Sequence, residues 1–318
     1  MAVETSQPVK LPYTQTPSKT WFGVSRLRRR EAIDGILMVL PWMIGFVVFL
    51  AGPMLFGVFT SLTRWDIISP PIFVGLENFQ TMFSGQDELF GKSLAVTGLY
   101  TLISAPLHVV LAFILASLLN SKVPFKNFFR SAFYLPSILP VVASAILWSW
   151  VFNPDFGLLY YGLSFLGFQG PKWLADKNWS LAAIIIMNLQ YIGPNMIIML
   201  AGLQRVPIEL IEAAQLDGAN RWHMTRYITI PMVSSVIFLV IINNINASFQ
   251  TFTQAFLMTG GGPQYSTYFY MLHLYNQAWV SFKMGYASAM AWVMFVIIIG
   301  FLYIHFRLSR LWVYSDVN

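Results

Sequence analysis

The chain has 318 residues, of which 57% are hydrophobic and only 10% are charged, and its formal net charge is +6. A soluble domain of this size has too few polar side chains to cover so much apolar surface, so the composition predicts a membrane protein. The absence of cysteine excludes disulfides, thiol catalysis and cysteine-ligated metal sites.

The N-terminal residues 1–20 are polar and contain Pro, Ser and Thr, which predicts a disordered tail. Four arginines, between Arg26 and Arg30, then precede an apolar segment with no charged residue from Ile36 to Leu62. A cleavable signal peptide would have a shorter apolar core, so we expect this segment to remain as a span. The predicted organisation is a tail at residues 1–30, a transmembrane domain at 31–307 and a C-terminal tail at 308–318.

Six charge-free stretches are long enough to cross a bilayer, which takes about 20 helical residues. Backbone groups at membrane depth have no water to bond, so the spans must be helical. The sequence therefore predicts an all-α membrane protein with six transmembrane helices. The predicted spans are Ile36–Ser61, Ser93–Leu119, Ser131–Phe152, Leu181–Leu203, Met232–Leu257 and Gly285–Phe306.

The basic residues predict the orientation of these spans. With the N-terminus inside, fourteen Lys and Arg residues fall on the cytoplasmic side and five on the outer side. This bias predicts a multi-pass protein of the cell inner membrane with both termini in the cytoplasm. An even number of spans follows, so we interpret Tyr265–Phe282 as an interfacial or partly buried outer segment.

Several predicted spans carry a polar stripe, because their polar residues fall on one side at roughly 100° per residue. Such groups are unfavourable against lipid, so they indicate either interhelical hydrogen bonds or a watery path. On helices two and three, both interpretations stay open for Thr97, Thr101, Ser104, His108, Ser137, Ser144 and Trp148. On helices four and five, the amides favour a path for a neutral polyhydroxylated solute, with candidate residues Asn188, Tyr191, Asn195, Asn243, Asn246, Gln250 and Gln254.

The longest cytoplasmic connection, residues 206–231, joins helices four and five. Pro207 suits a first helical turn, and the following helix has an apolar face with small residues. Gly218 permits a turn after this helix, and we expect Asp217 to cap the second helix, which Pro231 ends. The result is a helix–turn–helix elbow, or alternatively an amphipathic loop lying on the membrane. The apolar face comprises Ile208, Ile211, Ala213, Ala214 and Leu216.

Two parts of this elbow form a signature. The sequence Glu212-Ala213-Ala214, then Asp217-Gly218, then Ile228-Thr-Ile-Pro231 resembles the E-A-A-x-x-x-G and I-x-L-P elements of permease subunits of binding-protein-dependent ABC importers. Thr225 stands where this family often has an aromatic residue, and Ile230 replaces the usual leucine. The carbohydrate-uptake branch, which handles maltose, oligosaccharides or glycerol phosphate, is similar at residues 73–79, 133–136, 258–263 and 285–290.

The resemblance implies the type I ABC importer permease fold and a non-catalytic subunit. Its expected partners are a second homologous permease in a heterodimer, two nucleotide-binding ATPase subunits, an extracytoplasmic solute-binding protein and membrane lipid. The chain itself should bind no cofactor, since the partner ATPases would use ATP and Mg²⁺. The elbow would be the coupling helix, with the ATPase-coupling residues Glu212, Ala213, Ala214, Asp217, Gly218 and Pro231.

Other chemistry finds no support in the sequence. The run Gly260-Gly261-Gly262 lacks the lysine of a phosphate-binding loop, and the four histidines have no metal-ligand spacing. No basic helix with interleaved aromatics suggests nucleic acid. The alternative function is an ion-gradient-driven secondary transporter of a neutral polar solute, although such proteins usually place charges within the membrane. An intramembrane enzyme would need a paired nucleophile and base, which we do not find.

Overall fold

The computed structural model describes residues 26–314 except 122 and 169. The chain divides into two units, Met1–Leu55 and Phe56–Asn318. Most of the predicted N-terminal tail lies outside the described residues, but Arg26–Arg30 already belong to the first helix. At the other end, the last helix continues to Ser309, two residues beyond the predicted domain boundary, and residues 315–318 are outside the description.

The first unit consists of α1 (Arg26–Phe46), the π-helix η1 (Val47–Ala51) and the start of α2 (Gly52–Ser61). Pro53 has no amide hydrogen and cannot continue the regular helical ladder. The helical turn immediately before Pro53 contains one extra residue and is a π turn, in which the Gly52 amide donates to the Val47 carbonyl. Large apolar side chains such as Met38 and Phe49 are about 80% exposed, 83% and 81% respectively, so this helix requires lipid or another chain around it.

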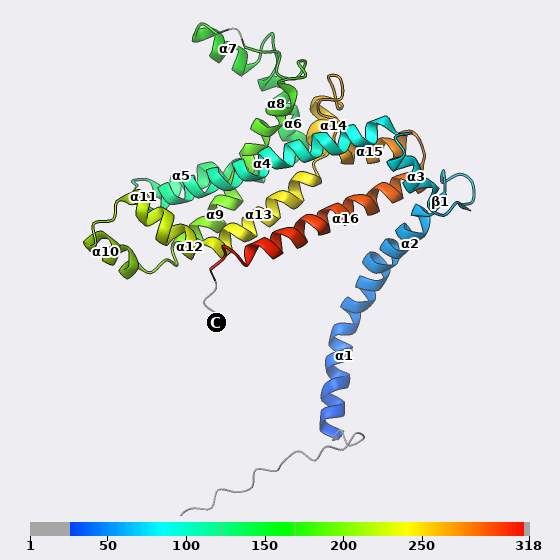
Figure 1. Ribbon diagram of the computed structural model, residues 1–318, viewed down its shortest axis with the longest axis horizontal. Helices are drawn as coiled ribbons and strands as arrows, with labels where there is room; N and C mark the ends of the chain where they lie inside the picture. Colours follow the sequence, from blue (N-terminus) through cyan, green and yellow to red (C-terminus); the bar gives the residue numbers. More distant parts are fainter. Residues whose placement is uncertain (1–25, 122, 169, 315–318) are drawn as a thin grey trace, which may run out of the picture. The chain divides into compact units, whose positions relative to one another are not determined.

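The second unit is a bundle built around α4 (Glu88–Asn120), the longest helix of the described residues. It packs against α9 (Ile192–Leu203) and α13 (Ser234–Phe249), and α13 also contacts α16 (Met284–Ser309) (Figure 1). Fully buried small residues on α4 let its neighbours approach closely, as membrane helices require. These residues are Ala112 and Ala116, with Ala105 almost as deeply buried.

Four continuous helices are long and apolar enough to cross a membrane, and they match the first, second, fourth and sixth predicted spans. The fourth combines α8 (Ser180–Asn188), the 3₁₀ turn η3 (Leu189–Tyr191) and α9. Pro194 lacks the amide that would bond the Gln190 carbonyl, which explains why the α-helix is interrupted there. The four spans are Glu31–Ser61, Glu88–Asn120, Ser180–Leu203 and Met284–Ser309.

The third predicted span, Ser131–Phe152, is bent rather than straight. Its two halves, Lys126–Ile138 and Val141–Val151 (α6), meet at an angle of 101°. The first half contains α5 (Lys126–Tyr134) and the 3₁₀ turn η2 (Leu135–Ile138). Pro140 disfavours helical geometry in the residue before it, and Leu139 is accordingly extended, with ψ 134°.

The fifth predicted span is also bent, and it is shorter than expected. Arg221–Met232 meets α13 at 71°, and α13 ends at Phe249 instead of continuing to Leu257. The next residues form a separate helix, α14 (Thr253–Met258). Phe249 packs against Phe301, whereas Phe252 packs against Tyr275, so the chain must turn between them for both rings to make these contacts.

The two ends of the bundle have different structures. One end carries α10 and is called the elbow end; the other carries the strands β1 (Thr63–Arg64) and β2 (Ile72–Phe73) and is called the hairpin end (Figure 1). This short antiparallel pair is the exception to the all-α expectation among the described residues. Other elements of the second unit are α3 (Glu77–Phe83), α7 (Leu158–Phe165), α15 (Tyr270–Tyr275) and the π-helix η5 (Asn276–Val280).

The segment interpreted as partly buried, Tyr265–Phe282, contains α15 and η5 and does not form a spanning helix. Phe269 and Tyr270 are fully buried, because they pack against α4 on one side and α16 on the other. The Tyr270 hydroxyl donates to the Met290 carbonyl of α16 at 2.8 Å. The segment therefore joins two spans at the hairpin end.

Candidate functional site

The elbow consists of α10 (Ile208–Leu216) and a second helical stretch, Arg221–Met232. Gly218 lies between them with φ +80°, the left-handed conformation expected from the sequence. The Gly218 amide donates to the Gln215 carbonyl and the Ala219 amide to the Ala214 carbonyl, at 3.0 and 2.9 Å. This pair of bonds is a Schellman ending, which satisfies the last carbonyls of α10 and fixes the turn.

The cap of the second helix differs from the expectation. Asp217 is the C-cap residue that follows α10, and Asn220 caps the next helix. The Asn220 side chain accepts a hydrogen bond from the His223 amide at 2.9 Å. The turn after Asp217 contains Gly218 and Ala219, so the residue that caps the second helix is Asn220 and not Asp217.

The second helical stretch has three parts, α11 (Arg221–Met224), the π-helix η4 (Thr225–Thr229) and α12 (Ile230–Met232). Pro231 cannot donate a backbone hydrogen bond, and a π turn precedes it, as before Pro53. The helix does not end at Pro231 as predicted. It continues to Met232, and the 71° bend follows at Val233, whose backbone is not helical. Pro231 therefore lies beside the joint between elbow and span.

The surface of the elbow carries both charged and apolar side chains. Glu212, Ala213, Asp217 and Gly218 are exposed, while Ala214 is half-buried. Large apolar residues are also exposed, and a patch of this kind marks a surface that another molecule covers. They are Ile208 (62%), Leu210 (43%), Leu216 (89%), Trp222 (69%) and Tyr227 (69%).

The polar candidates on the fourth span point into the bundle. The Asn188 side chain donates to the Tyr100 hydroxyl of α4 at 2.7 Å, and Asn195 donates to the Asn244 side chain of α13 at 3.1 Å. The hydroxyl of Tyr191 is buried and has no hydrogen-bond partner among the described residues. Asn188 and Asn195 are thus engaged in pairs that hold the span to its neighbours.

The candidates on the fifth span are arranged differently. Asn243 and Asn246 of α13 and its C-cap residue Gln250 form an exposed polar face, on which Gln250 donates to Asn246 at 2.7 Å. Gln254 lies apart from this face, because α13 ends at Phe249 and Gln254 belongs to α14. The structure therefore brings three of the four amides together.

The polar stripes on helices two and three are mostly buried, but few of their groups bond another helix. Among the described residues, the side chains of Thr101, Ser104, His108 and Ser144 have buried polar atoms without a hydrogen-bond partner. Thr97, Ser104 and His108 on α4 are nearly or fully buried. The Thr97 hydroxyl accepts from the Tyr270 amide at 2.8 Å, and the Trp148 indole donates to Gln190 at 3.1 Å. The Ser137 hydroxyl bonds within its own helical turn, where it donates to the Tyr134 carbonyl.

Asp87 and its partners form a cluster at the hairpin end that the sequence did not reveal. One oxygen of Asp87 accepts from the Leu89 and Phe90 amides and so caps α4. The other accepts from the Tyr286 hydroxyl of α16 at 2.6 Å and bonds the His273 ring of α15 at 2.7 Å. One carboxylate therefore ties three helices, although its partners lie almost 200 residues away in sequence.

The electrostatics of this cluster favour an ionised carboxylate. Burial by itself would raise the pKa of Asp87, but the hydrogen bonds from Tyr286 and His273 outweigh burial and hold the pKa below its ordinary value. Tyr268 extends the cluster, because its hydroxyl contacts the other His273 ring nitrogen at 3.2 Å and accepts from Asn276 at 2.9 Å. Within the residues the structure describes, no cluster of His, Asp or Glu could hold a metal ion.

Comparisons with known proteins agree with this architecture. Residues 108–313 match the family model described as binding-protein-dependent transport system inner membrane component. The chain is 38% identical to the probable ABC transporter permease protein YesP of Bacillus subtilis, over 92% of this chain and 95% of the relative. It is 35% identical to the multiple sugar-binding transport system permease protein MsmF of Streptococcus mutans, over 79% of this chain and 87% of the relative.

A solved structure has the same fold. A chain of a bacterial alginate ABC transporter, crystallised in complex with an alginate pentasaccharide-bound periplasmic protein, aligns with a TM-score of 0.74 and 23% identity. The alignment covers 90% of this chain and 98% of that one, which confirms the expected type I importer permease fold. The chain therefore belongs to the family of inner membrane components of binding-protein-dependent transport systems.

Proposed function

We propose that this chain is the membrane-spanning permease subunit of an ATP-driven sugar importer, and that its elbow couples the ATPase cycle to the bundle. The observation that carries the proposal is the elbow itself. It is a compact helix–turn–helix, it exposes Leu216 and Trp222, and it continues directly into α13. The sugar class is supported by relatives whose names specify multiple sugars or trehalose and maltose.

The partners follow from the exposed surfaces and the family. We infer that two ATPase subunits dock at the elbow end, one of them on the exposed apolar side chains of this chain. A second permease would cover the apolar sides of the bundle, and a solute-binding protein would deliver sugar at the hairpin end. The protein is a multi-pass inner membrane protein, and we place both termini in the cytoplasm because basic residues dominate that side.

The exposed amides Asn243, Asn246 and Gln250 are the best candidates for the translocation path. Amides exposed on a membrane helix are unfavourable against lipid, so we infer that they face a watery cavity shared with the second permease. Amide groups both donate and accept hydrogen bonds, which suits the hydroxyls of a neutral sugar. Asn188, Tyr191 and Asn195 would act behind this face by holding the fourth span.

Family membership does not support the alternative of an ion-gradient-driven secondary transporter. The proposed mechanism instead uses partner ATPases, which bind ATP and Mg²⁺ and close on each other. Their closure would move the docked α10, and the helical stretch Arg221–Met232 would transmit the movement to α13 as a lever. The bundle would then alternate between inward-facing and outward-facing states.

The decisive experiment replaces Gly218 with valine. A β-branched residue at φ +80° is strained by about 1–2 kcal/mol, so the turn between α10 and α11 should be lost. We expect Gly218→Val to abolish sugar uptake and the stimulation of ATPase activity by the solute-binding protein, in proteoliposomes containing the complete importer. The amount of the variant in the membrane should stay normal, because Gly218 is exposed and no neighbour lies within 4 Å of its would-be side chain.

The matched control is Gly218→Asn, because asparagine tolerates the left-handed region. This variant should retain most of the uptake. Normal uptake by Gly218→Val, or equal loss in both variants, would contradict the coupling role of the turn.

A further inference from the structure

The segment that follows α16, residues 310–314, folds back onto the joint between the elbow and α13 (Figure 1). The chain turns at the end of α16, where the Val313 amide donates to the Ser309 carbonyl at 2.8 Å. The next amide, that of Tyr314, donates to the side-chain oxygen of Ser234 at 2.8 Å. Ser234 is the first residue of α13 and lies directly after the 71° bend. Residues 310–314 are called the strap below.

Ser234 connects the strap to the last turn of the elbow. Its hydroxyl donates to the Pro231 carbonyl at 2.6 Å and accepts from the Tyr314 amide. The last carbonyls of a helix have no partner in a following turn, so a bend needs hydrogen-bond donors from elsewhere. Ser234 is only 1% exposed and Val233 beside it 2%, so water has little access to this hydroxyl. One buried side chain therefore joins the elbow, α13 and the strap.

Aromatic rings hold the strap and α16 to the same part of α13. Phe238 lies about one turn after Ser234 and stacks on the His305 ring of α16, with ring centroids 4.8 Å apart. Trp312 of the strap and Phe306 of α16 approach the same phenyl ring edge-on, with centroids at 6.3 and 5.0 Å. Side-chain packing therefore supports the backbone hydrogen bond that the strap makes to Ser234.

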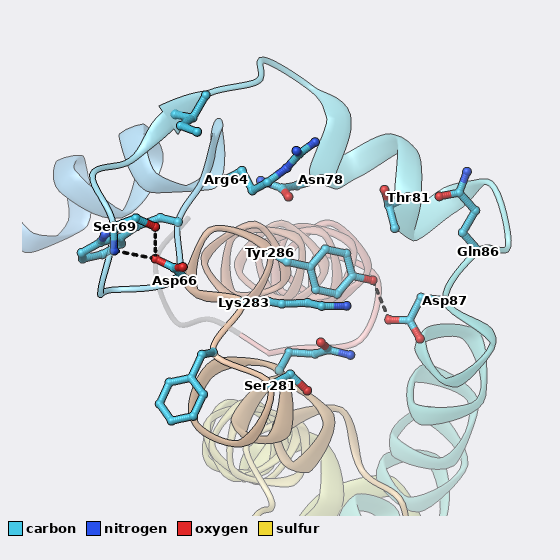
Figure 2. Close-up of a pocket in the computed structure, with 14 residues that line it drawn as sticks. Arg64, Asp66, Ser69, Asn78, Thr81, Gln86, Asp87, Ser281, Lys283 and Tyr286 are labelled. Carbon is cyan, nitrogen blue, oxygen red and sulfur yellow. Dashed lines mark hydrogen bonds between the residues drawn. The ribbon is translucent and has the colours of Figure 1, made fainter.

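The other end of α16 is also fastened. At the hairpin end, the Tyr286 hydroxyl of α16 donates to the Asp87 carboxylate at the start of α4 (Figure 2). Between these two attachments α16 is one continuous helix of 26 residues. A continuous helix moves as one body, so a displacement at the strap is carried to Asp87 at the opposite end of the bundle.

We propose that the strap is a second transmission route from the elbow, and that Ser234 is the positioning residue at its centre. The strap locks the joint, so that a movement of the elbow displaces α13 and α16 together and reaches the hairpin end through α16. Without the strap, the joint would act as a hinge at which the elbow moves while the spans lag behind. The inference rests on the coupling function proposed for the elbow.

The test uses two matched pairs of variants in the complete importer. Ser234→Ala removes the bridging hydroxyl, whereas Ser235→Ala changes the next serine, which is exposed. Tyr314→Pro removes the amide that donates to Ser234, whereas Tyr314→Ala keeps this amide. Both Tyr314 variants lose the same exposed ring, so a difference between them is due to the backbone hydrogen bond.

Hydrogen exchange, measured by mass spectrometry on the importer in nanodiscs, reports on the joint without any transport. We expect the amides of residues 226–238 to exchange about fivefold faster in Ser234→Ala and Tyr314→Pro, because a hydrogen bond that restrains the joint is lost. Ser235→Ala and Tyr314→Ala should exchange like the wild type. Wild-type exchange in Ser234→Ala and Tyr314→Pro would overturn the strap.

The ATP hydrolysed per sugar imported measures the transmission itself, in proteoliposomes with the solute-binding protein and radiolabelled glucose, galactose, maltose or trehalose. We expect this ratio to rise about fivefold in Ser234→Ala and Tyr314→Pro and to stay unchanged in the two controls, because the ATPases would cycle while the spans follow less often. A merely structural role would lower ATPase activity and uptake together at an unchanged ratio, and this result would overturn the transmission route.

Failure of the proposed function is distinguishable from failure of the strap. A wild-type importer that moves none of the four sugars would contradict the proposed sugar import, whereas hydrogen exchange would still decide whether the strap restrains the joint. In Gly218→Val the strap is intact, so exchange at the joint should match the wild type although uptake is lost.

Discussion

Gly218 and Gly285 are required for different physical reasons. Gly218 has free space around it, but its φ of +80° excludes a branched side chain. Gly285 lies in the first turn of α16 against β1, and a side-chain carbon there would lie 1.9 Å from the Thr63 carbonyl oxygen. The first constraint belongs to the backbone of the residue itself, and the second to a neighbour more than 200 positions away.

The close approach at Gly285 leads to a prediction about stability. Gly285→Ala should lower the stability of the complex by about 1–3 kcal/mol or more, because the contact is with backbone that cannot rotate away. The control is Gly300→Ala in the same helix, where nothing lies within 4 Å and alanine should be neutral or stabilising. Thermal unfolding of the detergent-solubilised importer measures both. A similar melting temperature for the two variants would contradict the close approach.

Asp87 operates at the scale of whole elements, because it joins α4, α15 and α16 through one carboxylate. Asp87→Asn removes the charge that the His273 ring and the Tyr286 hydroxyl contact, and His273 is buried with 1% exposure. We expect a loss of about 1–3 kcal/mol, the usual range for leaving a buried polar group poorly paired. The melting temperature at neutral pH measures this loss. The control is Asp66→Asn, which changes an exposed carboxylate in the loop between β1 and β2.

The pH dependence of this loss has a definite sign. The pKa of Asp87 is lowered from its ordinary value of 3.8, so its stabilising contribution is complete above that value and disappears as the pH falls through the lowered pKa. The difference in melting temperature between wild type and Asp87→Asn should therefore be constant near neutrality and shrink below about pH 4. A difference that grows on acidification would exclude this role for the carboxylate.

The helices show which features of the spans hydrophobic periodicity and composition can predict. The continuous spans Glu88–Asn120 and Met284–Ser309 follow directly from long charge-free stretches. The third and fifth spans were predicted at about the right place, but their bends of 101° and 71° were not. Proline marks both bends in the sequence, yet Pro106 lies inside the continuous helix α4, so proline alone does not decide where a helix turns.

At the scale of the molecule, the orientation of the bundle can be tested because the chain has no cysteine. A single cysteine introduced at Ser84, at the hairpin end, should react with a membrane-impermeant maleimide in intact cells. A single cysteine at Gln215, in α10, should react only after the membrane is permeabilised. Both positions are exposed, so access alone distinguishes them. The reverse pattern would place the elbow outside and exclude contact with a cytoplasmic ATPase.

The amino-acid sequence by itself determined that the chain lies in a membrane, the approximate limits of the four continuous spans, and the elbow with its glycine turn. These features depend on local composition or on residues close together in the chain. The family match and the fold neighbour agree with the membrane-spanning fold. The sequence did not determine which side of α13 meets α9. This packing decides that Asn195 bonds Asn244, while Asn243 and Asn246 are exposed.

Only the tertiary structure decided the cluster around Asp87. Asp87, His273 and Tyr286 come from three separate elements, and nothing local in their sequence positions distinguishes them from other polar residues at helix ends. Folding brings them together because α15 packs between α4 and α16, and η5 contacts α16, instead of forming a seventh span. Long-range contacts of this kind carry no short-range pattern, whereas helix propensity, charge bias and turn chemistry do.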